Sequence, residues 1–151
     1  MTAFQVQDPD YEARIRRVFR GQPAMETLGV TLFKASPGEL ELRMPYDSRF
    51  SQQNGFLHAG VVSTALDSAC GLAAYTLMPA QADVLTVEFK INLLAPAKGN
   101  IFRFVGTVVK PGRTLIVSEG RAFADDGTRE KLVATMSATL MTMLPQTSAV
   151  V

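Results

Sequence analysis

The sequence contains a single cysteine, a single histidine and no tryptophan. One cysteine excludes an internal disulfide and any metal site built from several thiolates. The charges nearly balance, at a net +1, so bulk electrostatics favour neither nucleic acid nor an anionic membrane surface. No apolar run is long enough to span a bilayer, and the N-terminus is polar where a secretory signal would be apolar. We therefore expect a cytoplasmic protein with no metal, no nucleic-acid partner and no membrane partner.

What is present is the composition of one folded domain. Hydrophobic residues make up 47% of the chain and charged residues 19%, which is enough apolar material for a full core at this length. We predict a single domain over 1–151, with an amphipathic helix at about 8–20 and a loose tail after 145. Asp8 would cap the helix and Gly21 would end it. The arginines of this helix either cover a solvated surface or contact an anionic ligand or a lipid.

Several segments carry the pattern of β-strands. Residues 39–44 alternate strictly between polar and apolar, which indicates a strand with one face in water. Short turns join consecutive segments, so neighbouring strands should pair antiparallel. The predicted strands cover residues 28–35, 39–44, 84–94, 100–110, 114–124 and 132–143. Because a helix that is apolar on nearly every side has to be enclosed, we predict an α+β fold in which a curled antiparallel sheet wraps around one long central helix.

That central helix is predicted over residues 58–78, after a polar loop that contains glycine. Asp67 is its only acid, and a carboxylate among apolar residues is costly unless something compensates its charge. The residues at helical spacing from Asp67 are small, so a second backbone or a slender ligand could approach this side. They are Gly60, Ser63, Thr64, Cys70, Gly71 and Ala74. Asp67 is thus a structural acid, an acid at a subunit interface, or a catalytic group.

The start of this helix is a second candidate site. Helix N-termini present unpaired N–H groups and a partial positive charge, which can hold an oxyanion. Ala59 and Gly60 would supply the donors. His58 either braces the loop through ring hydrogen bonds or takes part in the chemistry. Cys70 has no obvious activating neighbour, and we interpret it as a packed small residue rather than a nucleophile.

The stretch from residue 52 to residue 67 resembles the hot-dog-fold acyl-CoA thioesterases, in the branch of the phenylacetate-pathway (PaaI-like) enzymes. That branch has the pattern Asn-x-x-Gly-x-x-His-Gly-Gly, followed by an acid on the helix. Gln52 stands where the pattern has asparagine. A related branch, which resembles the 4-hydroxybenzoyl-CoA thioesterases, has glutamine at this position. Ala59 replaces a glycine whose backbone N–H is the functional group, so alanine can still serve. The matching positions are Gly55, His58, Gly60 and Asp67.

The resemblance implies hydrolysis of medium-chain or aromatic acyl-CoA to free acid and CoA, with no cofactor besides the CoA of the substrate. Asp67 would act as general base or as nucleophile, and Gln52, Ala59, Gly60 and His58 would form the other catalytic group. Family members are typically dimers, or tetramers built from dimers, and Asp67 of one subunit would meet Gln52 and Ala59 of its partner. The substrate-binding residues would be Asn54, Gly55, Ser63, Thr64, Gly71, Thr86, Lys98, Lys110 and Arg113.

Several alternatives remain open from the sequence. Lys98, Lys110 and Arg113 would bind the phosphates of CoA, or they are simply solvated turn residues. A non-catalytic acyl-CoA-binding protein on this fold would have a similar sequence. A hydratase or dehydratase would need a closely cooperating histidine and acid, and its His-Phe-Pro-Gly type of sequence is absent. A serine nucleophile is also not indicated, since no Gly-x-Ser-x-Gly motif occurs.

Overall fold

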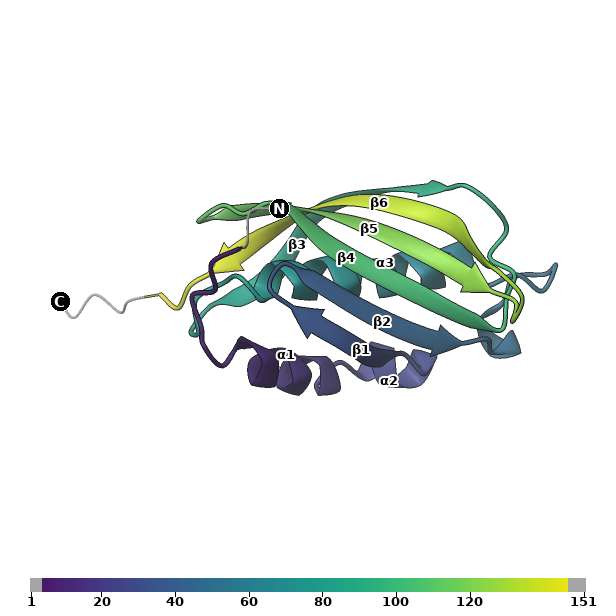
Figure 1. The fold of residues 1–151 in the computed structure, drawn as a ribbon, viewed down its shortest axis with the longest axis horizontal. Coiled ribbons are helices and arrows are strands. Elements are labelled where there is room, and N and C mark those ends of the chain that lie inside the picture. The colour runs from purple at the N-terminus through teal and green to yellow at the C-terminus, as the bar shows by residue number, and fades with distance from the viewer. Residues whose placement is uncertain (1–3, 147–151) are drawn as a thin grey trace.

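The computed structural model of the protein describes residues 4–146. A six-stranded antiparallel sheet, in the order β1-β2-β4-β5-β6-β3, curls around the central helix α3 (Figure 1). This arrangement confirms the predicted α+β hot-dog fold. The predicted loose tail falls mostly on residues 147–151, which lie outside the described part of the chain. None of the described helices is long and apolar enough to cross a membrane.

The elements follow the sequence pattern closely. The helices are α1 (Tyr11–Arg20), α2 (Pro23–Leu28) and α3 (Ala59–Tyr75), with one 3-10 turn, η1, at Ser48–Phe50. The strands are β1 (Thr31–Ser36), β2 (Glu39–Pro45), β3 (Asp83–Leu93), β4 (Ile101–Lys110), β5 (Leu115–Asp125) and β6 (Glu130–Met143). All predicted strands are present, with ends shifted by at most three residues. In β2, β4 and β5 every second residue is buried, as expected for a sheet with one face on the core.

A pair of glycines lets the sheet approach the central helix. Gly106 on β4 and Gly120 on β5 lie directly opposite each other in the ladder. A Cβ atom at Gly106 would lie 2.2 Å from the carbonyl oxygen of Ala69, and one at Gly120 would lie 2.9 Å from the sulfur of Cys70. Both distances are shorter than non-bonded atoms tolerate. The two missing side chains therefore set how closely α3 packs on the middle of the sheet.

The N-terminal region differs from the prediction at two points. The predicted strand over 28–35 begins only at Thr31, because residues 23–28 form the unpredicted helix α2. Pro23 suits the first turn of this helix, and Gly29 ends it in the left-handed conformation with φ 70°. The helix expected at about 8–20 begins at Tyr11, because Asp10 rather than Asp8 occupies the cap position. The Asp8 carboxylate instead accepts a hydrogen bond from the N–H of Asp10 and pairs with Arg14.

Asp8 forms a buried ion pair with Arg14, at 3.2 Å from Nε to Oδ2. The Arg14 guanidinium donates hydrogen bonds to the carbonyl oxygens of Tyr75 at 3.0 Å and Met78 at 2.9 Å. It thereby caps the C-terminal end of α3, which ends at Tyr75 rather than at the predicted residue 78. Arg14 is 4% exposed, so this arginine of α1 does not serve the anionic-ligand alternative.

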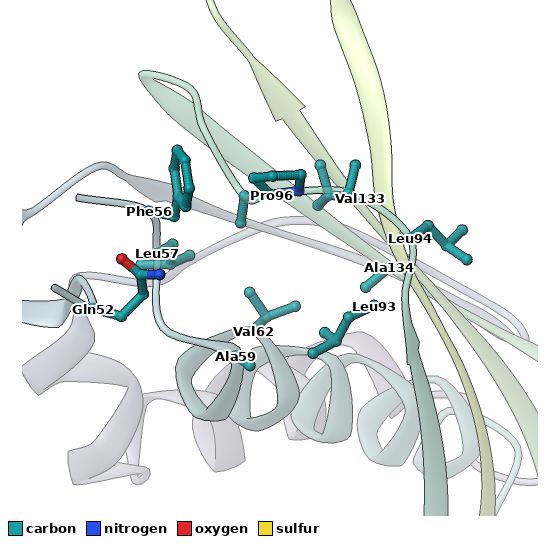
Figure 2. A pocket seen from close by; sticks show the side chains of 12 residues that line it. Gln52, Phe56, Leu57, Ala59, Val62, Leu93, Leu94, Pro96, Val133 and Ala134 are labelled. Carbon is teal, nitrogen blue, oxygen red and sulfur yellow. The ribbon is translucent and has the colours of Figure 1, made fainter. Parts of the chain in front are cut away.

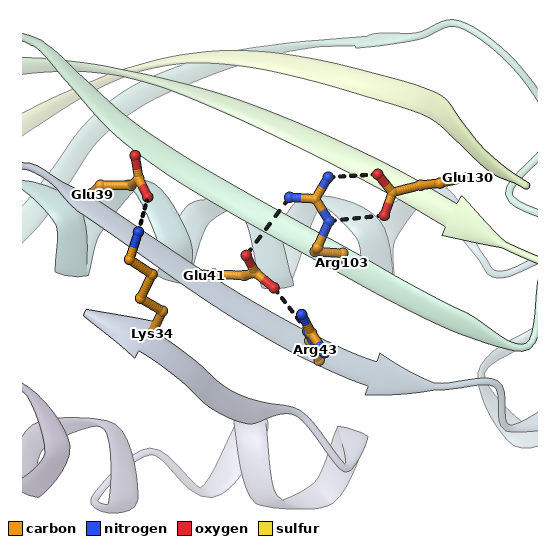
Figure 3. A network of polar contacts seen from close by, with 6 residues as sticks. All are labelled: Lys34, Glu39, Glu41, Arg43, Arg103 and Glu130. Atoms are coloured by element: carbon orange, nitrogen blue, oxygen red, sulfur yellow. Dashed lines mark hydrogen bonds and ion pairs between the residues drawn. The ribbon is translucent and has the colours of Figure 1, made fainter. Parts of the chain in front are cut away.

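Ion pairs within one strand and between strands cover part of the outer face of the sheet (Figure 3). Arg103 on β4 pairs with Glu130 on β6 at 2.6 Å, and Glu41 on β2 pairs with Arg43 at 2.8 Å. Arg103 also lies 3.7 Å from Glu41, so these pairs form one network. Exposed pairs of this kind contribute about 0–1 kcal/mol each. The network thus mainly keeps this face hydrated, in line with the predicted wet face of residues 39–44.

The two edges of the sheet are unlike each other. Helix α1 packs beside β1 at one edge (Figure 1). At the other edge, within residues 4–146, β3 pairs only with β6. This strand exposes large apolar side chains, with Leu85 at 57%, Val87 at 52% and Phe89 at 42%. A long apolar edge strand with free backbone groups is a surface on which another strand can pair.

Candidate functional site

The loop before α3 is held in a tight conformation by its own backbone. The N–H of Gln52 donates to the carbonyl oxygen of Phe56 at 2.8 Å, and the N–H of Gly55 donates to that of Gln52 at 2.9 Å. Gly55 has φ 80°, a conformation that other residues rarely adopt. The Tyr46 hydroxyl donates to the carbonyl oxygen of Gly55 at 2.9 Å. Gly55 therefore shapes the loop.

His58 is the N-cap of α3. Its Nδ1 accepts a hydrogen bond from the N–H of Gly60 at 2.9 Å, as the bracing alternative for this residue predicted. The same bond occupies Gly60, so this N–H is not the free oxyanion donor that the sequence suggested. The N–H of Ala59 makes no hydrogen bond to any residue in 4–146. One unpaired donor therefore remains at the start of the helix.

This donor lies at an apolar cavity of about 450 Å³ (Figure 2). The cavity lies between the loop, the first turns of α3 and the segment that follows β3. Gln52 and Ala59 line one side. The Gln52 side-chain oxygen accepts a hydrogen bond from the N–H of Asn54, which leaves the amide nitrogen as a second donor. The remaining lining is almost entirely apolar: Phe56, Leu57, Val62, Leu93, Leu94, Ala95, Pro96, Ala97, Val133 and Ala134.

Sequence reasoning missed most of this lining. Leu93 is the last residue of β3 and Leu94 to Ala97 follow it. The Leu-Leu-Ala-Pro run before a turn is the one signal that could have indicated an apolar connection at a site. Val133 and Ala134 belong to β6, and only the curl of the sheet brings them to the start of α3. These lining residues decide the shape of the cavity.

Asp67 lies away from this cavity. It is not among the residues that line the cavity, and it follows Ala59 by eight residues, roughly 12 Å along a helix that rises 1.5 Å per residue. Its Oδ1 accepts a hydrogen bond from the hydroxyl of Thr86 on β3 at 2.7 Å. The predicted catalytic residues therefore form two separate groups in the chain. One holds the hydrogen-bond donors and the cavity, and the other holds the carboxylate.

The small side of the helix is open only in its first half. The hydroxyls of Ser63 and Thr64 donate back to the carbonyl oxygens of Ala59 and Gly60, both at 2.8 Å. Gly71 is buried, and a Cβ there would lie 3.9 Å from Leu140. The prediction that Gly71 binds substrate is therefore not supported, because β6 covers this turn of α3.

Cys70 is also part of the core. Its burial, with smaller effects from the negative charges of Asp67 and Glu119, raises the pKa of the thiol from the ordinary 9.0 to about 12. A neutral thiol is a poor nucleophile at physiological pH. The prediction that Cys70 is a packed small residue is confirmed.

The three predicted cations do not lie together. Lys98 belongs to the connection between β3 and β4, next to residues that line the cavity. Arg113 lines a different hollow with Leu77, beyond the far end of α3. Lys110 ends β4 close to the same turn. Of these three cations, only Lys98 therefore lies near the cavity.

Comparison with known proteins relates this site to a family. A family model described as “Thioesterase superfamily” matches residues 54–131, just over half of the chain. A Halobacterium salinarum protein named “Putative esterase” is 32% identical over 124 residues, which cover 79% of this chain and 80% of that protein. A Saccharolobus solfataricus protein with the same name is 37% identical over 92 residues. That match covers 61% of this chain and 65% of that protein.

Solved structures give the same picture of the fold. A thioesterase family protein from Silicibacter pomeroyi superposes with a TM-score of 0.88 at 54% identity, over 89% of this chain and 99% of that one. The Escherichia coli PaaI protein of the phenylacetic acid degradation operon superposes with a TM-score of 0.79, over 89% of this chain and 94% of that one. At 13% identity this second likeness concerns the fold alone.

Proposed function

Because the chain belongs to the thioesterase superfamily, we propose that it hydrolyses acyl-CoA thioesters whose acyl group is a medium-length chain or an aromatic ring. Family membership indicates a hydrolase that acts on thioesters. The choice of acyl group rests on one observation. Two donors without a hydrogen-bond partner among residues 4–146, the N–H of Ala59 and the amide nitrogen of Gln52, belong to residues that line a cavity whose other walls are apolar.

These donors suit the oxygen of a thioester carbonyl. In the proposed complex the acyl group fills the cavity and the carbonyl oxygen accepts hydrogen bonds from Ala59 and Gln52. The positive end of α3 adds to the stabilisation as the oxygen gains negative charge. The backbone donor at the helix terminus can contribute about 3 kcal/mol in the transition state. His58 supports this arrangement indirectly, because its bond to Gly60 fixes the first turn of the helix.

The carboxylate would come from a second subunit. Thr86, which binds Asp67, and Leu93, which lines the cavity, lie seven positions apart on β3. Suppose that β3 pairs antiparallel with β3 of a partner and that the two-fold axis passes between residues 89 and 90. Thr86 would then face Leu93 of the partner subunit. Asp67 would then stand at the partner's cavity. This pairing would also cover the exposed apolar side chains of β3.

We therefore propose a homodimer with two shared sites, and such dimers can associate further into tetramers. In the hydrolytic step Asp67 removes a proton from water as the water oxygen bonds to the carbonyl carbon. The carbon–sulfur bond then breaks, and the CoA thiolate takes up the proton. In the alternative route the carboxylate itself attacks, and water later hydrolyses the resulting anhydride. The proposed reaction needs water and no cofactor.

The two routes can be separated by isotope labelling. A single turnover in ¹⁸O-water places the label directly in the product acid if Asp67 acts as a base. If Asp67 is the nucleophile, the first product acid carries an unlabelled oxygen from the carboxylate whenever water attacks the aspartyl carbonyl. Mass spectrometry of the product and of the peptide that contains Asp67 reads both outcomes.

The proposed function is tested by release of free thiol across a panel of acyl-CoA substrates, with Asp67→Asn as the control. We expect turnover of medium-chain or aromatic acyl-CoA that the control loses. Binding of acyl-CoA without thiol release would favour the non-catalytic alternative. Faster cleavage of an oxygen ester than of the matching thioester would contradict the CoA assignment.

A further inference from the structure

We propose that Lys98, Arg129 and Lys131 bind the phosphates of the CoA nucleotide and so select acyl-CoA over thioesters that lack phosphate. The inference rests on the proposed function, since it assigns the part of the substrate that lies outside the cavity. The three cations line a hollow of about 350 Å³ on the surface. Phe56 and Pro96 line both this hollow and the apolar cavity, so the two are contiguous. A substrate with its acyl group inside could extend over these two residues towards the cations.

Backbone hydrogen bonds hold together the two segments that carry these cations, the connection between β3 and β4 and the turn between β5 and β6. The N–H of Asn100 donates to the carbonyl oxygen of Asp125 at 2.7 Å, and its side-chain amide donates to that of Asp126 at 3.2 Å. A Cβ at Gly99 would lie 2.8 Å from the Asp125 oxygen, so this close approach requires glycine. The connection that carries Lys98 is thus fastened to the turn that precedes Arg129. Cations held on fixed backbone lose less entropy on binding than mobile ones.

The same connection is hydrogen-bonded to the loop before α3. The N–H of Leu57 donates to the carbonyl oxygen of Ala97 at 3.0 Å, immediately before Lys98. Leu57 precedes the cap of α3 by one residue. The cations and the proposed oxyanion donors are therefore connected through backbone hydrogen bonds, which would hold the nucleotide and the thioester in a constant relation.

The local charge favours an anion. None of the three cations forms an ion pair with another residue in the described range 4–146. The one acid in the lining, Asp126, is engaged in its own turn. It accepts hydrogen bonds from the hydroxyl of Thr128 at 2.6 Å and from the backbone N–H groups of Thr128 and Arg129, and these lower the pKa of its carboxyl to about 2. Three positive charges against one negative leave the hollow positive.

The test compares two substrates with the same acyl group, acyl-CoA and acyl-pantetheine, the second of which has no phosphate. In the Arg129→Gln/Lys131→Gln variant we expect KM for acyl-CoA to rise about tenfold, since hydrogen bonds between charged partners are worth this much or more. The value of kcat/KM for acyl-pantetheine should change by less than about twofold, because that substrate does not reach the cations. Added salt should raise KM for acyl-CoA in the wild type and much less in the variant.

The matched control is Arg17→Gln/Arg20→Gln, which removes two exposed charges from α1 and should leave both KM values as they are. A third variant, Lys110→Gln/Arg113→Gln, removes the two cations that the sequence suggested. The proposal is overturned if this third variant raises KM for acyl-CoA while the first does not. It is also overturned if the first variant impairs both substrates equally, since that result would indicate a structural role.

Binding without chemistry keeps this inference separate from the proposed function. Calorimetric titration with 3′-phosphoadenosine 5′-diphosphate measures the phosphate contacts alone. Loss of that binding in Arg129→Gln/Lys131→Gln supports the assignment even if no thioester is turned over. Equal binding by the wild type and this variant refutes it.

Discussion

Replacement of Asp67 by asparagine removes one negative charge and very little else. Asparagine has nearly the same shape, and its side-chain oxygen can still accept the hydrogen bond that the Thr86 hydroxyl donates at 2.7 Å. The fold and the β3 edge should therefore persist. Without a base or nucleophile, turnover should fall by about 100-fold or more, which corresponds to roughly 2.7 kcal/mol of transition-state stabilisation.

Thr86→Val is the matched control. This variant keeps the charge of Asp67 and removes only the hydrogen bond to it. A hydrogen bond to a charged group is worth about 1.5–3 kcal/mol, and Asp67 is only partly buried, so we expect a loss of about tenfold, near the lower end of that range. Thiol release gives the rates, and circular dichroism with light scattering checks that each variant is folded and associated. Full activity of a folded Asp67→Asn variant would refute the catalytic role.

A shared site makes a further prediction about mixtures. Asp67→Asn and Gln52→Ala impair different halves of the site, the second by about tenfold because it positions the substrate and transfers no proton. If each site combines Asp67 of one subunit with Gln52 of its partner, a mixed dimer contains one intact site. Subunit exchange in an equal mixture should then restore about a quarter of the wild-type activity. Activity no higher than the mean of the two variants would place the site within one protomer.

The remaining predictions concern the frame of the site. His58→Asn should retain more activity than His58→Ala and more than Asp67→Asn, because asparagine is also a good N-cap; a less active His58→Asn dimer would move the chemistry to the histidine. Gly106→Ala should lower the free energy of unfolding by about 1–3 kcal/mol in urea melts, because the added Cβ would clash with the backbone of α3. Gly71→Ala should raise it by up to about 1 kcal/mol, because the atom nearest to the added Cβ, in Leu140, would lie 3.9 Å away. Arg14→Gln should lower the free energy of unfolding by about 3–5 kcal/mol, because it leaves the buried carboxylate of Asp8 without its ion-pair partner. A loss below about 1 kcal/mol would contradict the capping role. Folding raises the pKa of the Cys70 thiol from 9.0 to about 12. The buried neutral thiol therefore contributes fully to the free energy of unfolding below pH 9, and this contribution is lost as the pH rises towards 12. The difference in free energy of unfolding between the wild type and Cys70→Ala should therefore shrink between these two pH values.

Much of the fold is contained in local sequence patterns. The alternation of residues 39–44 determines a strand with one wet face, and the nearly uniform apolarity of the central stretch requires a helix that the sheet encloses. His58 was interpretable as a cap because it stands between a glycine-containing loop and an apolar helix. Helix α2 escaped prediction, since six residues offer too little periodicity to distinguish a helix from a strand end.

The sequence by itself determined which residues are available for chemistry: one acid in an apolar helix, one histidine before it and a loop that contains an amide. Only the tertiary structure decided how they combine. It assigned the N–H of Gly60 to His58, left that of Ala59 unpaired, and put Asp67 beside Thr86 rather than at the cavity. The physical reason is that hydrogen-bond partners and cavity walls come from residues far apart in the chain, such as β6 against the start of α3. No local pattern encodes which of them meet.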